Sequence, residues 1–345
     1  MVWVLAIAAA IWLIGAQMRA SVRARWALIG LLYALVLLAQ FLLAEAHPVR
    51  QMLGGSFGEW LLVGVLVAVV FGYREGLARL KARAQPAAAP VVDGKLQGAE
   101  LERYARHIML REIGGTGQRK LKEAKVLVIG AGGLGSPALM YLAAAGVGTI
   151  GVIDDDAVEA TNLQRQIAHS DDRVGMPKVF SAKEAMKGIN PYAVVLPYHR
   201  RLDREVAADL IGAYDLVLDG TDNFDTRYLA NAVCAAQGKP LISGALTQWE
   251  GQISIFDPAH GAPCYQCVFP EAPAPHLAPS CAEAGVLSPL PGVIGAMMAV
   301  EAVKVITGAG EALRGRMLIY DALYAETRII GVSRREDCPV CGSGA

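Results

Sequence analysis

The sequence lacks an excess of charge of either sign. Its 345 residues include 32 lysines and arginines against 32 aspartates and glutamates, which gives a formal net charge of zero. Nucleic acid binding depends on positive charge that neutralises phosphates. The balance therefore excludes a chain that attracts nucleic acid through its overall charge, and we expect no nucleic acid partner.

The sequence also lacks the Gly-x-x-x-x-Gly-Lys-Ser/Thr motif with which P-loop enzymes bind nucleoside triphosphates. A P-loop nucleoside triphosphatase is therefore disfavoured. We find no internal repeat.

Cysteine is scarce, yet four of the six cysteines stand in two Cys-x-x-Cys pairs. Cys264/Cys267 and Cys338/Cys341 have the spacing of a four-thiolate zinc site built from two distant knuckles. Four thiolates leave no coordination position for water, so this zinc would be structural. Disulfides are disfavoured in a cytoplasmic domain, and a redox pair is the alternative. Cys234 lies in an apolar helical stretch and is expected to be a buried packing residue.

Apolar residues are abundant, and their excess is concentrated at the N-terminus. Residues 1–18, 26–45 and about 52–73 predict three transmembrane helices in a membrane region at residues 1–83. A signal peptide is disfavoured because no basic residue precedes the first apolar core, and buried helices of a soluble protein are another alternative. The third stretch is short unless it begins near Met52, which would place Glu59 inside the span.

Basic residues predict the orientation of these spans. They occur after the first and third stretches, at Arg19, Arg23, Arg25, Arg74, Arg79, Lys81 and Arg83. The loop between the second and third stretches has only Arg50 and His47. Because basic loops remain in the cytoplasm, we expect a multi-pass protein of the cell inner membrane with its N-terminus outside and its catalytic domain cytoplasmic. Two spans, with the third stretch lying on the membrane, are the alternative.

Residues 84–98 read as a linker rich in alanine and proline, which leaves 99–345 as the working domain. Within it, residues 125–130 are apolar and β-branched, as expected of a buried parallel strand. They lead into Gly-x-Gly-x-x-Gly at Gly130, Gly132 and Gly135, and residues 136–146 read as a helix. This context is the one that a dinucleotide-type fingerprint requires, with phosphate favoured at the helix N-terminus.

A second strand at residues 149–154 ends in Asp154, near the customary spacing for a ribose hydroxyl. Alone, this pattern is more typical of NAD or FAD than of ATP, so an NAD-dependent oxidoreductase remains an alternative. The residues that follow shift the interpretation toward a triphosphate. Arg165 and Lys178 would each read singly as surface charges, but together with Asp222, after a strand at 216–219, they indicate a triphosphate and Mg²⁺.

Residues 101–345 resemble the MoeB/ThiF/HesA family, bacterial relatives of the ubiquitin-activating enzymes. The matching motifs are Arg103-Tyr-Ala-Arg106-His, Gly130-Ala-Gly-Gly-Leu-Gly, residues 161–166, Gly175-Met-Pro-Lys178, Asp219-Gly-Thr-Asp-Asn223, Glu250-Gly-Gln-Ile and both cysteine pairs. The resemblance implies an α/β fold: a doubly wound, mostly parallel, Rossmann-like sheet with a carrier-docking extension and a zinc site. The first 83 residues are outside the usual family pattern.

The resemblance further implies ATP-dependent adenylation of the C-terminal glycine of a ubiquitin-like sulfur-carrier protein, with release of pyrophosphate. By family match, Arg165 and Lys178 contact the phosphates, Asp222 binds Mg²⁺ and Asp154 holds the ribose. Other residues implied to lie at the nucleotide or to support its site are Gly133, Asn162 and Asn223.

Two further residues gain expectations from the resemblance. Arg106 resembles an arginine supplied across a dimer interface, which implies a homodimer; a surface ion pair is the alternative. Cys281 occupies a position that some members use as a nucleophile in thioester or persulfide transfer and others do not need. Because no rhodanese-like domain follows Cys341, we expect a separate sulfurtransferase or cysteine desulfurase as a partner.

The motifs at Glu250 and Cys281 resemble most the branch that activates the molybdopterin-synthase small subunit for molybdenum cofactor biosynthesis. The thiamine-pathway sulfur carrier is the nearest alternative. A membrane-tethered scaffold with an inactive nucleotide site stays open, and a relative that adenylates a modified tRNA base is disfavoured.

Overall fold

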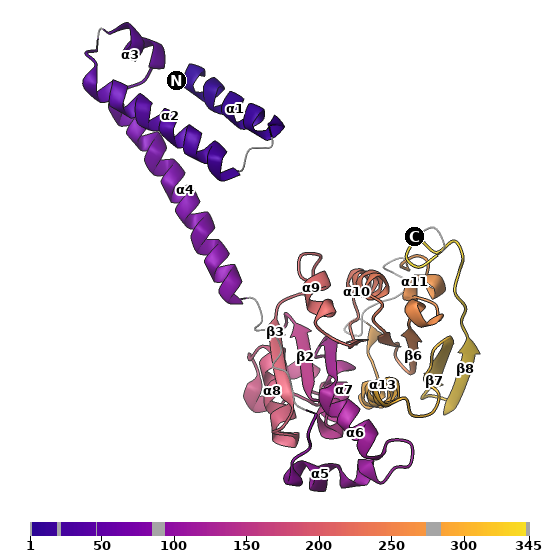
Figure 1. Ribbon diagram of the computed structural model, residues 1–345. Coiled ribbons are helices and arrows are strands. Elements are labelled where there is room, and N and C mark those ends of the chain that lie inside the picture. Colours follow the sequence, from indigo (N-terminus) through magenta and orange to yellow (C-terminus); the bar gives the residue numbers. More distant parts are fainter. Residues whose placement is uncertain (1, 19–21, 46, 85–93, 274–283, 343–345) are drawn as a thin grey trace. The chain divides into compact units, whose positions relative to one another are not determined.

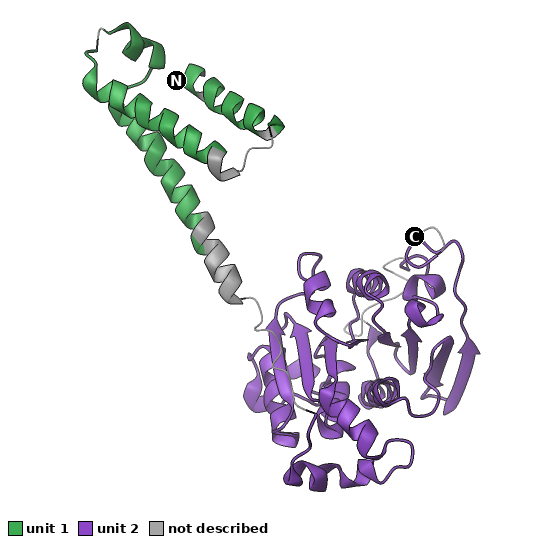
Figure 2. Ribbon diagram, in the orientation of Figure 1, with its two compact units in different colours: residues 1–85 green, residues 86–345 purple. Residues whose placement is uncertain are grey.

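The computed structural model describes residues 2–18, 22–45, 47–84, 94–273 and 284–342. The chain divides into two compact units, residues 1–85 and 86–345 (Figure 2). The predicted linker lies mostly outside the described residues.

The first unit is helical. Its described elements are α1 (Val2–Gln17), α2 (Val22–Leu42), α3 (Pro48–Leu53) and α4 (Phe57–Ala84) (Figure 1). A small apolar cluster joins three of them through the buried side chains of Val4, Val36 and Trp60. The Tyr33 hydroxyl of α2 donates a hydrogen bond of 2.7 Å to the Trp60 carbonyl of α4.

The third apolar stretch differs from one continuous span because two glycines divide it. Gly54 and Gly55 have φ of +65° and +77°, a region that favours glycine and ends α3. Ser56 then caps α4: its hydroxyl accepts from the Glu59 N–H, and the Glu59 carboxylate accepts from the Ser56 N–H at 2.7 Å. Glu59 is therefore a capping residue in the first turn of α4 and does not lie in the middle of an apolar segment.

One segment of the first unit, Arg25–Leu42, is long and apolar enough to cross a membrane by length and composition. The segments Ala6–Gly15 and Phe57–Tyr73 are shorter apolar helices. Leu290–Thr307 of the second unit passes the same test, but half of it is buried against its own domain. The three predicted spans thus stay a prediction.

The second unit is built on an eight-stranded mixed sheet of order β3-β2-β1-β4-β5-β6-β7-β8. The strands β1 to β5 pair in parallel, and β6, β7 and β8 continue the sheet antiparallel. Their bounds are β1 (Lys125–Ile129), β2 (Thr149–Asp154), β3 (Val194–His199), β4 (Leu216–Asp219), β5 (Leu241–Leu246), β6 (Glu250–Phe256), β7 (Arg316–Asp321) and β8 (Glu326–Gly331). The Rossmann-like prediction is confirmed, but the sheet is less parallel than expected because its extension is a meander.

Helices cover both faces of this sheet, as a doubly wound fold requires (Figure 1). One apolar core joins the sheet to α6 (Gly114–Glu123), α7 (Gly135–Ala145), α8 (Lys178–Ile189) and α13 (Leu290–Thr307). A second core on the other face includes α9 (Ala207–Gly212), α10 (Phe224–Ala236) and α11 (Tyr265–Val268). The remaining described helix, α5 (Gly98–Ile108), precedes α6 in the chain.

The register of the central strands brings three chain segments together. Ile129 at the end of β1 pairs with Ile153 of β2 and with Asp219 of β4. The loops that follow these strands therefore leave the same edge of the sheet side by side. This edge, at the carboxyl ends of parallel strands, is where open α/β sheets bind ligands.

Candidate active site

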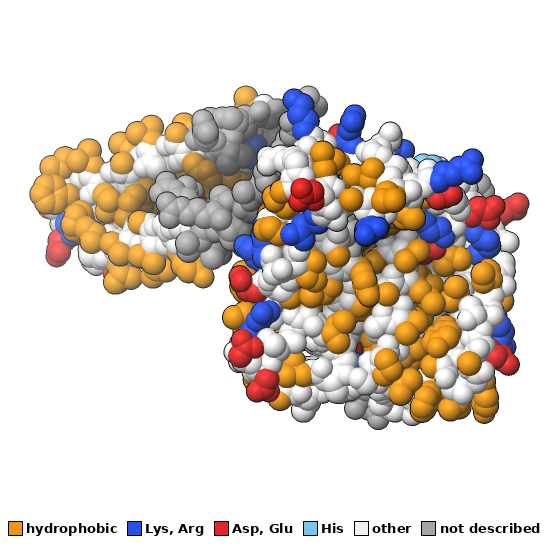
Figure 3. Space-filling model, turned by 90° about the horizontal axis from the view of Figure 1, so that it is seen from below, with side chains coloured by type: hydrophobic (Ala, Val, Ile, Leu, Met, Phe, Trp, Pro, Cys, Tyr) orange, Lys and Arg blue, Asp and Glu red, His pale blue; other side chains and the backbone are white. Residues whose placement is uncertain are grey.

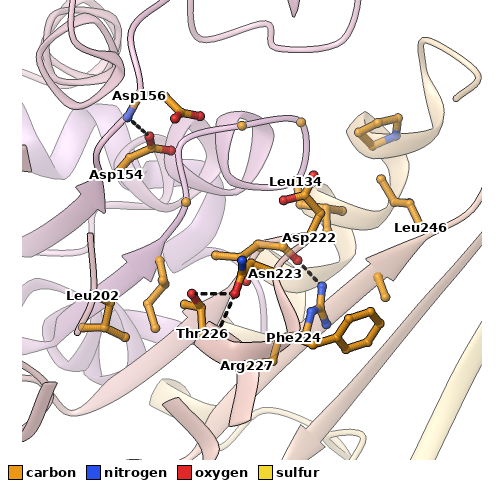
Figure 4. A pocket seen from close by; sticks show the side chains of 18 of the residues that line it. Leu134, Asp154, Asp156, Leu202, Asp222, Asn223, Phe224, Thr226, Arg227 and Leu246 are labelled. Carbon is orange, nitrogen blue, oxygen red and sulfur yellow. Dashed lines mark hydrogen bonds between the residues drawn. The ribbon is translucent and has the colours of Figure 1, made fainter. Parts of the chain in front are cut away.

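A cavity of about 970 Å³ lies at this edge of the sheet (Figure 4). Nine of the residues predicted to bind nucleotide line it: Gly130, Gly132, Gly133, Asp154, Asn162, Arg165, Lys178, Asp222 and Asn223. In Figure 4, Asp154 and Asp156 lie on one side of the cavity, while Asp222 and Asn223 lie across from them. The structure therefore brings together residues that are up to 93 positions apart between Gly130 and Asn223.

The glycine turn is shaped by close backbone contacts. Gly130 has a φ of +91°, which a residue with a side chain rarely adopts. A Cβ at Gly135 would overlap the carbonyl oxygen of Gly130, so only glycine lets the start of α7 pack on β1. Gly135 is thus a packing residue of the turn and is not among the residues that line the cavity.

The carboxylate of Asp154 holds the turn in place. Its Oδ2 accepts a hydrogen bond of 2.7 Å from the Ala131 N–H, and its Oδ1 accepts one of 2.8 Å from the Asp156 N–H. Burial raises the pKa of Asp154, and the charge of Lys178 acts in the opposite direction. Its assignment to the ribose stays a prediction.

Two cations stand beside the turn, each oriented by a neighbour. Lys178 is the first residue of α8, and its Nζ lies 2.7 Å from Oδ2 of the exposed Asp156. The Arg165 guanidinium donates a hydrogen bond of 2.9 Å to Oδ1 of Asn162. These contacts present both positive charges to the cavity, where phosphate oxygens would meet them.

The loop that carries Asp222 is fixed at both ends. After it, Asn223 caps α10, since its Oδ1 accepts from the Thr226 N–H at 3.0 Å. Before it, the fully buried Asp219 accepts from Ser243 Oγ at 2.9 Å and from Thr221 Oγ1 at 2.7 Å. Asn223 therefore supports the site as a helix cap.

Arg227 completes this support and was missed by sequence reasoning. Its guanidinium donates to Ser243 Oγ at 3.0 Å, to the Gly244 carbonyl at 2.7 Å and to the Thr221 carbonyl, and it lies 3.6 Å from the Asp219 carboxylate. No local motif marks it. The sequence offers one signal only, which is spacing: Arg227 comes four residues, or about one helical turn, after the Asn223 cap.

Other residues missed from the sequence also shape the cavity. Arg200 and Arg201 line it from the loop after β3, and recognition of that strand would have placed them at the ligand edge. Gln166 lines it too, and its buried Oε1 has no hydrogen-bond partner among the described residues. A ligand N–H or hydroxyl would satisfy this acceptor.

His169 holds the glycine turn through a hydrogen bond to its backbone. Its Nε2 donates a 2.8 Å hydrogen bond to the Ala131 carbonyl, which leaves Nδ1 to accept from Ser181 Oγ at 2.9 Å. Burial lowers the pKa of His169, so the ring is held neutral.

Arg106 does not line the cavity. Arg106 is exposed on α5, and in the described part of the chain no acidic side chain pairs with it. Cys281 lies outside the described residues, so its role stays a prediction.

The four paired cysteines converge as predicted. Sγ of Cys264 lies 3.8 Å from that of Cys267 and 3.5 Å from that of Cys338, and Cys267 and Cys341 are 3.4 Å apart. Tetrahedral zinc with bonds of about 2.3 Å requires sulfurs about 3.8 Å apart. The four thiols are buried, unlinked and able to hold zinc. Cys234 is buried as expected, and burial raises its pKa.

A family model, the ThiF family, matches residues 104–340. The chain belongs to the ThiF family. It is 48% identical over 249 residues to the SAMP-activating enzyme E1 of Haloferax volcanii, covering 72% of this chain and 92% of that protein. It is 49% identical over 247 residues to the sulfur carrier protein adenylyltransferase of Thermus thermophilus, covering 70% of this chain and 91% of that protein.

A further relative of this ThiF family chain is the probable adenylyltransferase/sulfurtransferase MoeZ of Mycobacterium tuberculosis, 47% identical over 71% of this chain and 63% of that protein. The prediction of a nucleotidyltransferase is thereby confirmed.

Solved structures agree on the fold. E. coli MccB with AMPCPP and MccA superposes with a TM-score of 0.62 at 25% identity, covering 70% of this chain and 74% of that one. PaaA superposes with a TM-score of 0.61 at 24% identity, covering 76% of this chain and 82% of that one.

Proposed function

We propose that this ThiF family member uses ATP to adenylate the C-terminal glycine of a ubiquitin-like sulfur carrier. An oxygen of the glycine carboxylate attacks the α-phosphorus, the bond from that phosphorus to the bridging oxygen breaks, and pyrophosphate leaves. The observation that carries the proposal is the meeting of Arg165, Lys178 and Asp222 around one glycine turn. The names of the relatives support a sulfur carrier as the substrate.

The charges of the cavity suit this reaction. A carboxylate and a triphosphate are both anions, so their approach requires positive charge fixed in advance where negative charge builds. Arg165 and Lys178 supply it, and phosphate oxygens could replace Asp156 at the buried Lys178 because the Asp156 carboxylate is exposed and can return to water. The backbone turn and the N-terminus of α7 add N–H dipoles for phosphate.

Asp222 would hold Mg²⁺, which would neutralise charge on the phosphates. The oxygen ligand that this carboxylate offers is of the type that Mg²⁺ prefers. Its position just before the capped start of α10 keeps it at the cavity.

The favoured carrier is the molybdopterin-synthase small subunit, with the thiamine-pathway carrier as the rival. The test is incubation of the purified enzyme with ATP and each carrier, followed by mass spectrometry of the carrier. We expect an AMP adduct on the first carrier, lost when its terminal glycine is deleted. Adduct formation on the thiamine-pathway carrier alone would reverse the assignment, and no adduct on either would contradict the proposed function.

We also propose a homodimer in which Arg106 serves the partner's cavity. Arg106 is exposed and outside its own chain's cavity lining, as an arginine that acts across an interface must be. Exposed apolar side chains that an interface could cover include Met109, Tyr141 and Val300. A broad apolar area is visible on the second unit in Figure 3.

The N-terminal unit is proposed to anchor the enzyme in the inner membrane, with the catalytic unit in the cytoplasm. Only 11% of the α2 segment Arg25–Leu42 is buried, so its apolar side chains face outward, where lipid would cover them. The first unit shows many apolar side chains and few charges on its visible surface (Figure 3). A separate sulfurtransferase or cysteine desulfurase would act on the adenylated carrier.

A further inference from the structure

Tyr265 and Asn231 lie between the cysteine cluster and the nucleotide cavity. Tyr265 follows Cys264 in the first knuckle, and Asn231 lies on α10. The backbone N–H of Tyr265 donates a hydrogen bond of 2.7 Å to Asn231 Oδ1. A buried contact therefore fastens the knuckle to α10.

The amide nitrogen of Asn231 fits a metal-bound thiolate. Asn231 is 1% exposed, and its Nδ2 has no hydrogen-bond partner among the described residues. A buried donor without a partner is unfavourable, because it has given up its hydrogen bond to water. The sulfur of Cys264, beside the residue that Asn231 already binds, would accept this N–H as a thiolate on zinc, as outer partners of metal ligands commonly do.

The side chain of Tyr265 reaches the other site. It is 4% exposed, and its ring packs against Phe256 and Tyr228 with centroids 5.3 and 5.4 Å away. Tyr265 also lines the nucleotide cavity together with Phe269, whose ring centroid is 4.8 Å distant. The residue between two metal ligands thus forms part of the cavity wall.

One face of α10 connects the two sites. Asn223, Arg227 and Asn231 are spaced four residues apart, so they follow one another along the helix. Asn223 caps the end beside Asp222, Arg227 braces Asp219 and the Thr221 carbonyl, and Asn231 binds the knuckle. A shift of the knuckle would therefore move both Tyr265 and the helix that positions Asp222.

We propose that Asn231 and Tyr265 are positioning residues that couple the four-cysteine site to the nucleotide cavity. Zinc and nucleotide would each strengthen the binding of the other, because coupling between two sites is reciprocal. The inference rests on the proposed function, which places ATP in this cavity.

The test measures the zinc affinity of the full-length enzyme at equilibrium by competition with a chromophoric chelator, with and without saturating ATP. Calorimetry measures ATP affinity on the same samples. We expect ATP to raise the zinc affinity of the wild type at least about fivefold, the lower end of usual coupling. Asn231→Ala and Asn231→Asp should bind zinc more weakly and lose the response to ATP. Asn231→Asp retains an acceptor for the Tyr265 N–H, but it replaces the donor with a carboxylate oxygen and so adds negative charge beside the cysteines.

Tyr265→Leu should retain zinc and bind ATP more weakly. Gln266→Ala is the matched control, since Gln266 lies in the same knuckle but not in the cavity lining, and it should behave as wild type. A wild type that binds ATP but has the same zinc affinity with and without it would overturn the coupling. Equal effects of Gln266→Ala and the Asn231 variants would also overturn it. Failure of the wild type to bind ATP would instead contradict the proposed function.

Discussion

At the scale of single residues, the charged groups of the cavity are positioned by hydrogen bonds from neighbouring side chains. Asp222 is exposed to the cavity, but its loop is set by Asp219, Ser243 and Arg227 beneath it. Similarly, the glycine turn is held by Asp154 from the side and by His169 from below. The electrostatics of the site are therefore fixed before the substrates arrive.

Replacing Arg227 with methionine should destabilise the fold strongly. The change leaves the fully buried Asp219 carboxylate without its cation and two carbonyls without their donor. Loss of one partner from a buried ion pair costs about 3–5 kcal/mol. Urea unfolding would measure this, with Arg200→Ala as control, since the half-exposed Arg200–Asp203 pair contributes about 0–1 kcal/mol. Equal losses in both variants would show that Arg227 does not brace the loop.

His169 should make stability depend on pH. Burial lowers its pKa below the ordinary 6.5, so between 6.5 and the lower folded value the unfolded chain binds the proton and the folded chain does not. Its contribution to stability is therefore fully present above pH 6.5 and is lost as the pH falls below it. His169→Gln should flatten this dependence in unfolding measurements from pH 7.5 to 5. An unchanged slope would rule out His169 as its source.

At the scale of elements, the strand–turn–helix unit from β1 to α7 is the part that positions the nucleotide. Its geometry depends on glycine at two places, because Gly130 has positive φ and Gly135 touches the Gly130 carbonyl. The neighbouring α8 has no such constraint, since Gly188 has open space around a new Cβ.

Gly135→Ala should disrupt the turn and weaken ATP binding by at least tenfold, because the added methyl overlaps backbone. Gly188→Ala, a helical position with room, should instead stabilise the protein by about 0.5–1 kcal/mol and leave ATP binding unchanged. Calorimetry with ATP and thermal unfolding would measure both. Normal ATP affinity in Gly135→Ala would show that the close packing of the turn is dispensable.

Most of this unit could be predicted from the sequence because its signals are local. The β-branched run before Gly130, the glycine spacing and the acids at the ends of β2 and β4 are each visible within a few residues. Arg200, Gln166 and Arg227 could not be found that way, since their roles depend on contacts that only the folded sheet creates. The antiparallel extension was likewise not predicted, because alternation of apolar and polar residues along a strand does not indicate the order or direction of the strands in a sheet.

At the scale of the whole molecule, the two units differ in how much apolar surface they bury and in which of them contains the cavity. The N-terminal helices bury little of their apolar surface, whereas the second unit contains the two large cores and the cavity. The homodimer proposal assigns the exposed Arg106 of one copy to the cavity of its partner.

Complementation tests the shared site. Arg106→Ala and Asp222→Ala should each be inactive in adenylation, yet a mixture that exchanges subunits should recover activity. A mixed dimer contains one cavity that retains both Asp222 and the partner's Arg106. Inactivity of a verified mixed dimer would contradict the supply of Arg106 across the interface.

Pyrophosphate exchange tests most directly whether this cavity uses ATP to activate a carrier's C-terminus. Labelled pyrophosphate should enter ATP only when enzyme, Mg²⁺ and a carrier with an intact terminal glycine are all present. Arg165→Ala and Asp222→Ala should abolish the exchange. Absence of exchange by active, folded wild-type enzyme with every carrier tested, or exchange that persists without any carrier, would contradict the account.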